Sequence, residues 1–231
     1  MRLVTWNCYR GPYEKKSAAL DGLKPDVAVM QECSKPVTNV PGVLWFGQES
    51  SPGLAIQVRQ PFSVDILPQD PNTPKYIVPV KITGPIEFTL LAVWTTNSKP
   101  SQYIRGLAKA IDIYEHLLRG QPSVVMGDFN SNAIWDERHP KDLNHSSVVN
   151  RLQRCGLISA YHFKRNEEHG LERESTFYHH WKPEKPFHID YCFISRSWQH
   201  SILEVHVGSY EDWKTHSDHR PLAVEISENG V

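Results

Sequence analysis

The sequence predicts an α/β protein in which helices cover packed β-sheets. Short runs rich in β-branched and aromatic residues recur along the chain between Gly and Pro residues, which is typical of extensive sheet. A few longer segments suited to helices lie between these runs. The chain has 231 residues, 39% of them hydrophobic, and this is enough to bury one substantial core. We therefore expect one domain spanning residues 1–231.

The expected strands share a short apolar run that ends at a turn former or a polar residue. They are Leu3–Trp6, Val27–Met30, Val43–Phe46, Leu54–Val58, Phe62–Leu67, Ile77–Ile82, Phe88–Trp94, Val124–Met126, His188–Ile194, Ile202–Val207 and Leu222–Ile226. Proline residues punctuate 60–85, but neither a low-complexity linker nor an internal repeat interrupts the chain. One continuous domain remains the simplest organisation.

Helices are expected between the strands at Glu14–Leu23, Gln102–Arg119 and Ser146–Cys155. The second of these has an apolar face formed by Ile104, Leu107, Ala108, Ile111 and Leu118. The most polar stretch, Glu167–Glu174, is expected to be a solvated surface loop.

Composition limits the function classes. Asp and Glu total 26 against 25 Lys and Arg, so there is no basic excess of the kind that binds nucleic acid tightly and nonspecifically. A polyanionic substrate stays compatible if a metal and a local cleft supply positive charge. The four cysteines, Cys8, Cys33, Cys155 and Cys192, lie far apart, and we expect reduced thiols. The twelve histidines show no grouping with the close spacing of a structural zinc site.

The first residues, Met1–Trp6, lack the basic region and apolar run of a secretory signal, although a secreted form whose leader had been removed would look the same. Apolar stretches fall short of the roughly 18 to 20 residues that cross a bilayer. We therefore expect no membrane partner and a cytoplasmic location.

Polar residues at strand ends are candidates for chemistry, because a sheet holds such groups in fixed positions at its rim. Asn7 follows the first expected strand, where alone it would be an ordinary turn residue. Glu32 closes the second strand within Gln31-Glu32, and its carboxylate could bind a hard cation or simply be solvated. Asp128 and Asn130 follow the strand Val124–Met126 in Gly-Asp-Phe-Asn, which could equally form a turn.

Two further candidates lie near the C-terminus. Asp190 interrupts an otherwise apolar strand, and a buried carboxylate needs a partner. Asp218 and His219 occur in Thr-His-Ser-Asp-His-Arg before the last strand, where adjacent Asp and His side chains could bind a metal and handle a proton or phosphate.

Together, and in this order, the five motifs resemble those of the endonuclease/exonuclease/phosphatase family, over nearly the whole chain. The resemblance implies a deoxyribonuclease-I-like fold, a four-layer α/β sandwich in which two mixed sheets face each other with helices outside. It also implies hydrolysis of phosphate esters. Family members act on DNA, RNA, lipids and inositol phosphates, so the fold does not settle the substrate.

The resemblance implies a role for each motif, and the chemistry agrees. Glu32, with Asn7 and Asp218 directly or through water, would hold Mg²⁺, or Mn²⁺ as a substitute, since hard cations prefer oxygen ligands. Asp190 would orient His219. The attacking water needs a base, and the sequence leaves Asp128 and His219 as alternatives.

Asn130 would donate a hydrogen bond to the phosphate or to its water. One departure from the family pattern is Trp94, which stands where many relatives have His or Tyr. Asn97 is the candidate to replace that phosphate donor, although it could be an ordinary loop residue. Arg105 and Tyr103 are weaker candidates for contact with substrate.

Aromatic and basic residues mingle in Trp135–Lys141 and Thr176–Lys185, where they could stack bases and contact phosphates or simply form surface and core. Because repair-type nucleases are the commonest analogy among the family members, nucleic acid is the leading substrate class. A small phosphorylated molecule is the alternative, favoured by the near-neutral charge. A catalytically silent binding module is the rival from another class, and the full set of polar residues argues against it.

Overall fold

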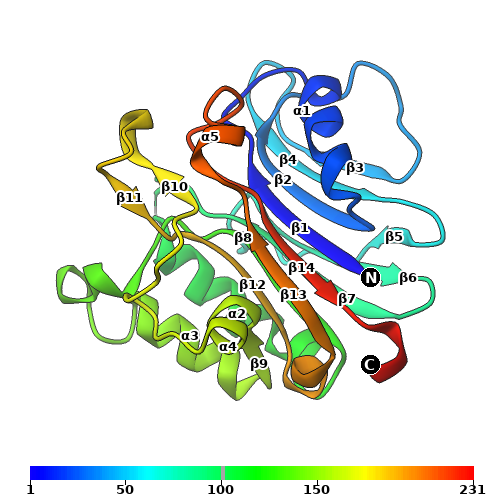
Figure 1. Ribbon diagram of the computed structural model, residues 1–231. Coiled ribbons are helices and arrows are strands. Elements are labelled where there is room, and N and C mark those ends of the chain that lie inside the picture. The colour runs from blue at the N-terminus through cyan, green and yellow to red at the C-terminus, as the bar shows by residue number, and fades with distance from the viewer. Residues whose placement is uncertain (100–101) are drawn as a thin grey trace.

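Two six-stranded sheets pack face to face in the computed structural model, which describes residues 1–99 and 102–231, and helices cover the outer faces (Figure 1). The first sheet has the order β13 (Ile202–Val207), β14 (Leu222–Ile226), β1 (Arg2–Asn7), β2 (Val27–Cys33), β4 (Gly53–Val58) and β3 (Val43–Phe46). The second has the order β5 (Ser63–Ile66), β6 (Ile77–Thr83), β7 (Phe88–Trp94), β8 (Ser123–Asp128), β12 (Asp190–Ser195) and β9 (Leu157–Ser159). The predicted α/β sandwich is confirmed.

Both sheets are mixed. The pairs β1–β2 and β7–β8 are parallel, and the other described pairs within the two sheets are antiparallel. Parallel neighbours end at the same edge of a sheet, so the residues that follow β1 and β2 lie together. The same holds for those that follow β7 and β8.

The core between the sheets is built by alternation along the strands. In the first sheet, Leu3, Val27 and Val29 face the second sheet, which contributes Leu90 and Met126 among others. Alternate side chains point the other way because successive residues of a strand face opposite sides. Each central strand is therefore apolar on both faces, which explains why the runs are nearly continuous in sequence.

The outer faces are covered by helices. Helix α1 (Tyr13–Leu20) packs on Val4 and Met30 of the first sheet. Helices α2 (Ile104–Leu118) and α3 (His145–Arg154) pack on the second, and the predicted apolar face of α2 is buried. Helix α4 (Ala160–Arg165) lies beside β12 and β13, while α5 (Tyr210–Trp213) precedes β14.

A two-stranded ribbon, β10 (Phe177–Tyr178) and β11 (Pro186–Phe187), lies with α5 at the end of the sandwich where β1 ends (Figure 1). The expected strands and helices are all present, with ends shifted by a few residues. All four cysteines are free and buried, as predicted for reduced thiols. Within residues 1–99 and 102–231, helices long and apolar enough to cross a bilayer are absent.

Candidate active site

Asp128 and Asp190 face each other across the β8–β12 pair, where they are partners in the strand register. Both side chains are fully buried. Gly127 permits this geometry: its φ is +150°, and a Cβ atom there would lie 1.8 Å from the Val93 carbonyl oxygen. Any larger residue would push β8 away from β7, so the glycine sets the position of the catalytic candidate that follows it.

Asn7 links the two sheets at this end. Its Nδ2 donates to Glu32 Oε1 at 3.0 Å and to Asp128 Oδ2 at 2.9 Å. Glu32 has a φ of +58° and lies where the register of β2 against β4 shifts between Gln31 and Cys33. This bulge reorients the Glu32 side chain relative to a regular strand. A strained backbone at a polar strand end is typical of functional positions.

Asp190 and His219 form the pair that the sequence predicted. His219 Nδ1 lies 2.9 Å from Asp190 Oδ2, and both side chains are buried. Among the described residues, Nε2 of His219 has no hydrogen-bond partner, which leaves it available to a substrate. Thr176 Oγ1 accepts the Asp190 N–H at 3.0 Å and so helps to fix the carboxylate.

Residues that the sequence did not single out hold the His219 segment in place. Ser217 Oγ donates to the Asn7 carbonyl at 2.7 Å and accepts the His219 N–H at 2.9 Å. The buried Arg220 donates to the carbonyls of Ser217 and His219. Its guanidinium lies over the Tyr178 ring. The only sequence signal for these roles was their adjacency to Asp218-His219.

Asn130 completes the cluster from the turn after β8. Its backbone N–H donates to Asp128 Oδ1 at 2.8 Å, and its Nδ2 contacts Asp128 Oδ2 at 2.9 Å and the Thr95 carbonyl at 3.0 Å. The positive φ of +46° is one that asparagine tolerates better than most residues. Asn130 therefore holds the Asp128 carboxylate in position through these hydrogen bonds.

Burial and mutual repulsion shift the pKa values of the acidic residues. Burial raises the pKa of Asp128 to about 7, and the neighbouring Asp190 carboxylate adds to this increase. Burial also raises the pKa of Asp218. Burial opposes the charged form of His219, yet the Asp190 carboxylate outweighs it and raises the pKa of His219 to about 9. At neutral pH the imidazole is therefore a cation and Asp128 is close to its midpoint.

The site could hold a metal ion. Asp128 and Asp190 offer carboxylate oxygens within 4.8 Å of each other and of a His219 ring nitrogen, although the cationic imidazole would not itself be a ligand. Asp190 Oδ1 is buried and receives no hydrogen bond from the described residues. The half-buried Glu32 and the buried Asp218 add carboxylates to the same cluster, and such an excess of acids favours a cation.

The remaining candidates lie outside this cluster. Asn97 is exposed, and its Oδ1 accepts from Gln102 Nε2 at 2.6 Å, which leaves Nδ2 directed elsewhere. Arg105 is exposed near the start of α2 and makes no hydrogen bond or ion pair with the acidic cluster among the described residues. The half-buried Trp94 packs on Tyr76, with ring centroids 4.5 Å apart.

Trp94 also lines a pocket of about 360 Å³ that the sequence did not reveal. Its lining combines three aromatic rings with basic side chains: Tyr76, Trp94, Tyr103, Lys75, Lys99 and Lys109. The pocket adjoins the cluster through Thr95, whose carbonyl accepts from Asn130. Aromatic faces beside ammonium groups suit a planar, anionic ligand.

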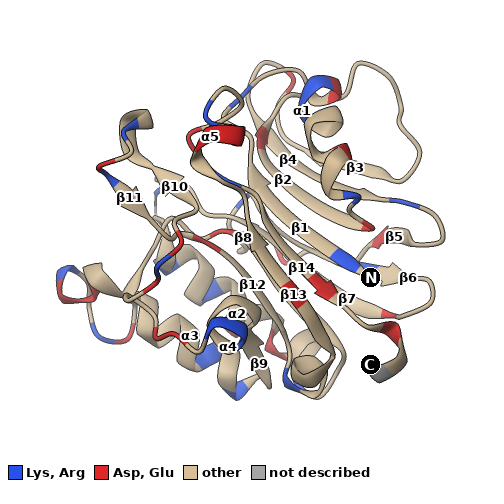
Figure 2. Ribbon diagram, in the orientation of Figure 1, with Lys and Arg blue, Asp and Glu red and all other residues tan. Residues whose placement is uncertain are grey.

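The two aromatic and basic segments, Trp135–Lys141 and Thr176–Lys185, also lie near the site. Phe177 in β10 packs against His219 with the rings tilted and their centroids 4.6 Å apart, and Trp135 packs on Phe187 in β11. Trp181 contacts the exposed Tyr9 ring. Elsewhere Lys and Arg are dispersed among acidic residues, as Figure 2 shows for one view, so any binding surface for an anion must be local.

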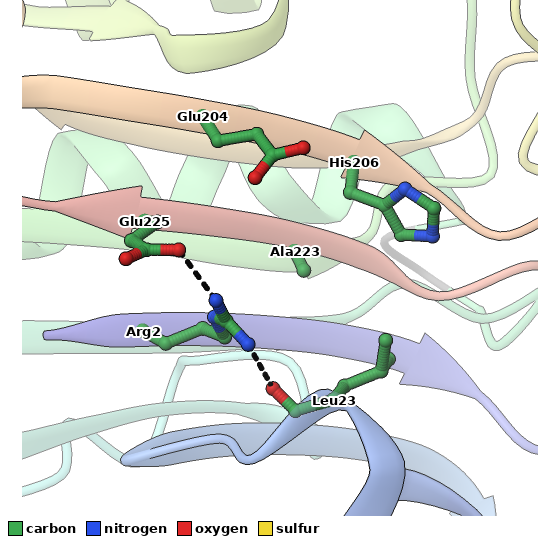
Figure 3. Close-up of a pocket in the computed structure, with 6 residues that line it drawn as sticks. All are labelled: Arg2, Leu23, Glu204, His206, Ala223 and Glu225. Carbon is green, nitrogen blue, oxygen red and sulfur yellow. Dashed lines mark hydrogen bonds and ion pairs between the residues drawn. The ribbon is translucent and has the colours of Figure 1, made fainter.

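A smaller pocket, of about 100 Å³, lies at the opposite end of β1 from Asn7 (Figure 3). There Arg2 forms an ion pair with Glu225 and donates to the Leu23 carbonyl. The charge and the hydrogen-bond donors of the guanidinium therefore already have partners within the protein, and we do not assign a function to this pocket.

Comparisons with known proteins agree with this geometry. A model of the endonuclease/exonuclease/phosphatase family matches residues 4–219. A search of curated proteins found no match. Several solved structures share the fold, and the identities with this chain are low. The 3′ phosphatase NExo from Neisseria, bound to product DNA hairpin, has a TM-score of 0.70 and 17% identity, covering 98% of this chain and 99% of its own.

Two AP endonucleases are similar to the same extent. The enzyme from Archaeoglobus fulgidus has a TM-score of 0.67 and 16% identity, covering 98% of this chain and 99% of its own. LMAP from Leishmania major has a TM-score of 0.70 and 13% identity, with coverage of 97% and 87%. The predicted deoxyribonuclease-I-like arrangement of two mixed sheets is confirmed.

Proposed function

The chain belongs to the endonuclease/exonuclease/phosphatase family, and we propose that it is a Mg²⁺-dependent phosphodiester hydrolase that acts on DNA or RNA by in-line attack of water. Phosphate-ester hydrolysis unites the family, so the chain is a phosphoesterase enzyme. The observation that carries the proposal is the Asp190–His219 pair beside the acidic cluster of Glu32, Asp128 and Asp218.

The donor set fits a hard cation. Glu32 would hold Mg²⁺, with Asn7 and Asp218 as direct ligands or through water, and Mn²⁺ could substitute. The unpaired Asp190 Oδ1 and the raised pKa values of Asp128 and Asp218 support a cation here, because it would relieve the repulsion between these acids. A bound Mg²⁺ would offset charge on the phosphate oxygens and on the departing oxygen.

The protonation states favour a division of labour that the sequence left open. The pKa of Asp128 is about 7 before a cation binds and would fall on binding, so the carboxylate would be ionised and able to accept a proton from the attacking water. His219, with a pKa of about 9, is suited to donate from Nε2 to a phosphate oxygen or to the leaving oxygen. Asp190 would hold the imidazolium in orientation and stabilise its charge. Asn130 would position Asp128.

Nucleic acid is the substrate class that we propose. The solved relatives include a phosphatase with bound DNA hairpin and two AP endonucleases. The pocket around Trp94 supports this choice, since stacking on an aromatic ring tolerates any base and lysines can contact phosphates. Asn97 and Arg105 would contact the substrate from the neighbouring loop and from the start of α2.

A small phosphorylated molecule is the second candidate. The pocket of about 360 Å³ has the size of a small-ligand site. The net charge of −1 gives no general attraction to a long polyanion. A cytoplasmic location is consistent with the four free thiols.

A substrate panel tests the proposal. The purified chain is assayed with Mg²⁺ on duplex DNA carrying an abasic site, duplex DNA with a 3′ phosphate, single-stranded DNA, RNA, and nucleoside or sugar phosphates. We expect cleavage of a nucleic acid substrate at least about tenfold faster, as kcat/KM, than any small molecule, which is a difference of about 1.4 kcal/mol. Asp128→Asn should abolish it. A preference for small phosphates would overturn the nucleic acid assignment.

A further inference from the structure

A second group of potential metal ligands lies outside the active site. His162, His169 and Glu172 each offer a ligand atom within 4.8 Å of the other two. His162 belongs to α4, and the other two lie in the loop that follows it (Figure 1). The side chains of His162 and Glu172 are only 7% and 4% exposed. This loop was expected to be solvated, but it turns these groups into the protein.

Two pairs of polar atoms around this group lie close enough for an ion to bridge them. His162 Nε2 lies 3.0 Å from Glu172 Oε1, and His169 Nδ1 lies 3.1 Å from Nε2 of the buried His145. Metal–nitrogen bonds of about 2.0 to 2.1 Å give tetrahedral ligand-to-ligand distances of roughly 3.3 Å. The His162 and His169 rings stack with centroids 3.6 Å apart, so they are in direct contact, and one ring would tilt for both nitrogens to point at the same ion.

Hydrogen bonds behind these groups fix their orientation. Ser159 Oγ contacts His162 Nδ1 at 2.7 Å, which leaves Nε2 as the inward-facing nitrogen. Asn132 Nδ2 donates to Glu172 Oε2 at 3.1 Å, so Oε1 is the oxygen turned to His162. Metal-binding histidines and carboxylates are usually held by such outer partners.

A neighbouring imidazole also has an unsatisfied nitrogen. His145 is only 1% exposed, its Nε2 contacts His169, and its buried Nδ1 forms no hydrogen bond with the described residues. Several imidazoles packed together repel as cations and satisfy each other poorly as neutral rings. A cation bound between them would use their lone pairs instead.

We propose that His162, His169 and Glu172 form a second metal site, which binds a transition-metal ion, Zn²⁺ in the first instance. His145, whose Nε2 contacts His169 Nδ1 but which lies outside this group of three, would have to move inward to take the fourth position. Two or three imidazole nitrogens with one carboxylate oxygen suit Zn²⁺ and disfavour Mg²⁺, so the two sites select different ions. This inference does not rest on the proposed function.

The site would be structural, and its position links it to the active site. Asn132, which donates to Glu172, also donates to the His188 carbonyl at 2.8 Å. Asn132 lies two residues after Asn130, and His188 lies two residues before Asp190. Metal binding would therefore tie the loop after α4 to both segments that carry the catalytic candidates.

Cobalt titration tests the site with a readout independent of activity. The chain is stripped with chelator, saturated with Mg²⁺ to fill the oxygen site, and titrated with Co²⁺. We expect one Co²⁺ per chain with the visible absorption of a tetrahedral site, displaced by one equivalent of Zn²⁺. Zn²⁺ should also raise Tm by roughly 5 to 10 °C at saturating concentration.

Variants locate the ion. His169→Ala and the shape-preserving Glu172→Gln should lose the cobalt band, whereas His116→Ala, at an exposed histidine of α2, should keep it. Glu32→Gln should also keep the band, which separates this site from the catalytic one. If the variants do not fold, X-ray absorption of the zinc-loaded parent decides, since it should show at least two imidazoles and the catalytic cluster contains only His219. An absent band, a band that persists in folded His169→Ala, or a shell with one imidazole would overturn the proposal.

Discussion

Disrupting the Asp190–His219 pair should have a large and non-additive effect on the rate. The pKa of His219, about 9 against an ordinary 6.5, corresponds to about 3 kcal/mol in favour of the imidazolium. Asp190→Asn removes the charge responsible, and burial then favours the neutral imidazole. At pH 7 the variant would lack the proton that we assign to Nε2. We expect a rate loss of about 10²- to 10⁴-fold, the usual range for a proton-transfer group.

His219→Ala should give a similar loss, and the double variant should be no more than a few-fold slower than the worse single variant. A carboxylate that acts only through an imidazole contributes nothing once the imidazole is gone. Single-turnover rates on the best substrate measure the coupling, and circular dichroism checks folding. His216→Ala, at an exposed histidine of the same segment, is the matched control. Losses that multiply in the double variant would show that the two residues act separately.

Three further predictions concern the metal and the substrate. Glu32→Gln should keep the fold, because the amide oxygen can still accept a hydrogen bond from Asn7. The variant should bind Mg²⁺ at least about 100-fold more weakly. An Mg²⁺ affinity that calorimetry finds unchanged would remove Glu32 from the site. Mg²⁺ binding near pH 7 should release protons, because a cation lowers the pKa of Asp128 from about 7. The proton release should fade well above pH 7 and should be smaller in Asp128→Asn. Calorimetry in buffers of different ionisation enthalpy measures the release. A heat of Mg²⁺ binding that does not depend on the buffer at pH 7 would refute the raised pKa of Asp128. Asn97→Ala should lower turnover by about 10²- to 10³-fold with little effect on binding if its free Nδ2 replaces the histidine donor, while Trp94→Phe should be mild. A rate for Asn97→Ala within a few-fold of the parent would leave His219 as the only phosphate-contacting side chain of the pair.

The fold could be predicted largely because its central strands are apolar on both faces. Runs such as Val27–Met30 and Val124–Met126 stand out against the Gly, Pro and polar residues around them, and their positions are confirmed. The short elements β9, β10 and β11, and helices α4 and α5, have too few residues to show a period. Their formation depends on tertiary contacts that the sequence does not display.

Some residues of the candidate site could likewise be predicted from the sequence, and others could not. Strand ends identified Asn7 and Asp128, and the interruption of an apolar run identified Asp190; the sheet edge brings these positions together. The bulge at Glu32 and the support from Arg220 depend on register and packing, which a pattern cannot specify. The cluster of His162, His169 and Glu172 escaped notice because its spacing matches no common zinc motif.

Hydrolysis of a nitrophenyl phosphodiester in isotopically labelled water tests the central claim most directly. With Mg²⁺ we expect nitrophenol release and one label in the phosphoryl product, because water attacks phosphorus. Chelator should reduce the rate to background, Mg²⁺ should restore it, and Asp128→Asn should stay at background under both conditions. Equal rates with Mg²⁺ and with chelator, in protein shown to be folded, would contradict metal-assisted hydrolysis at this site.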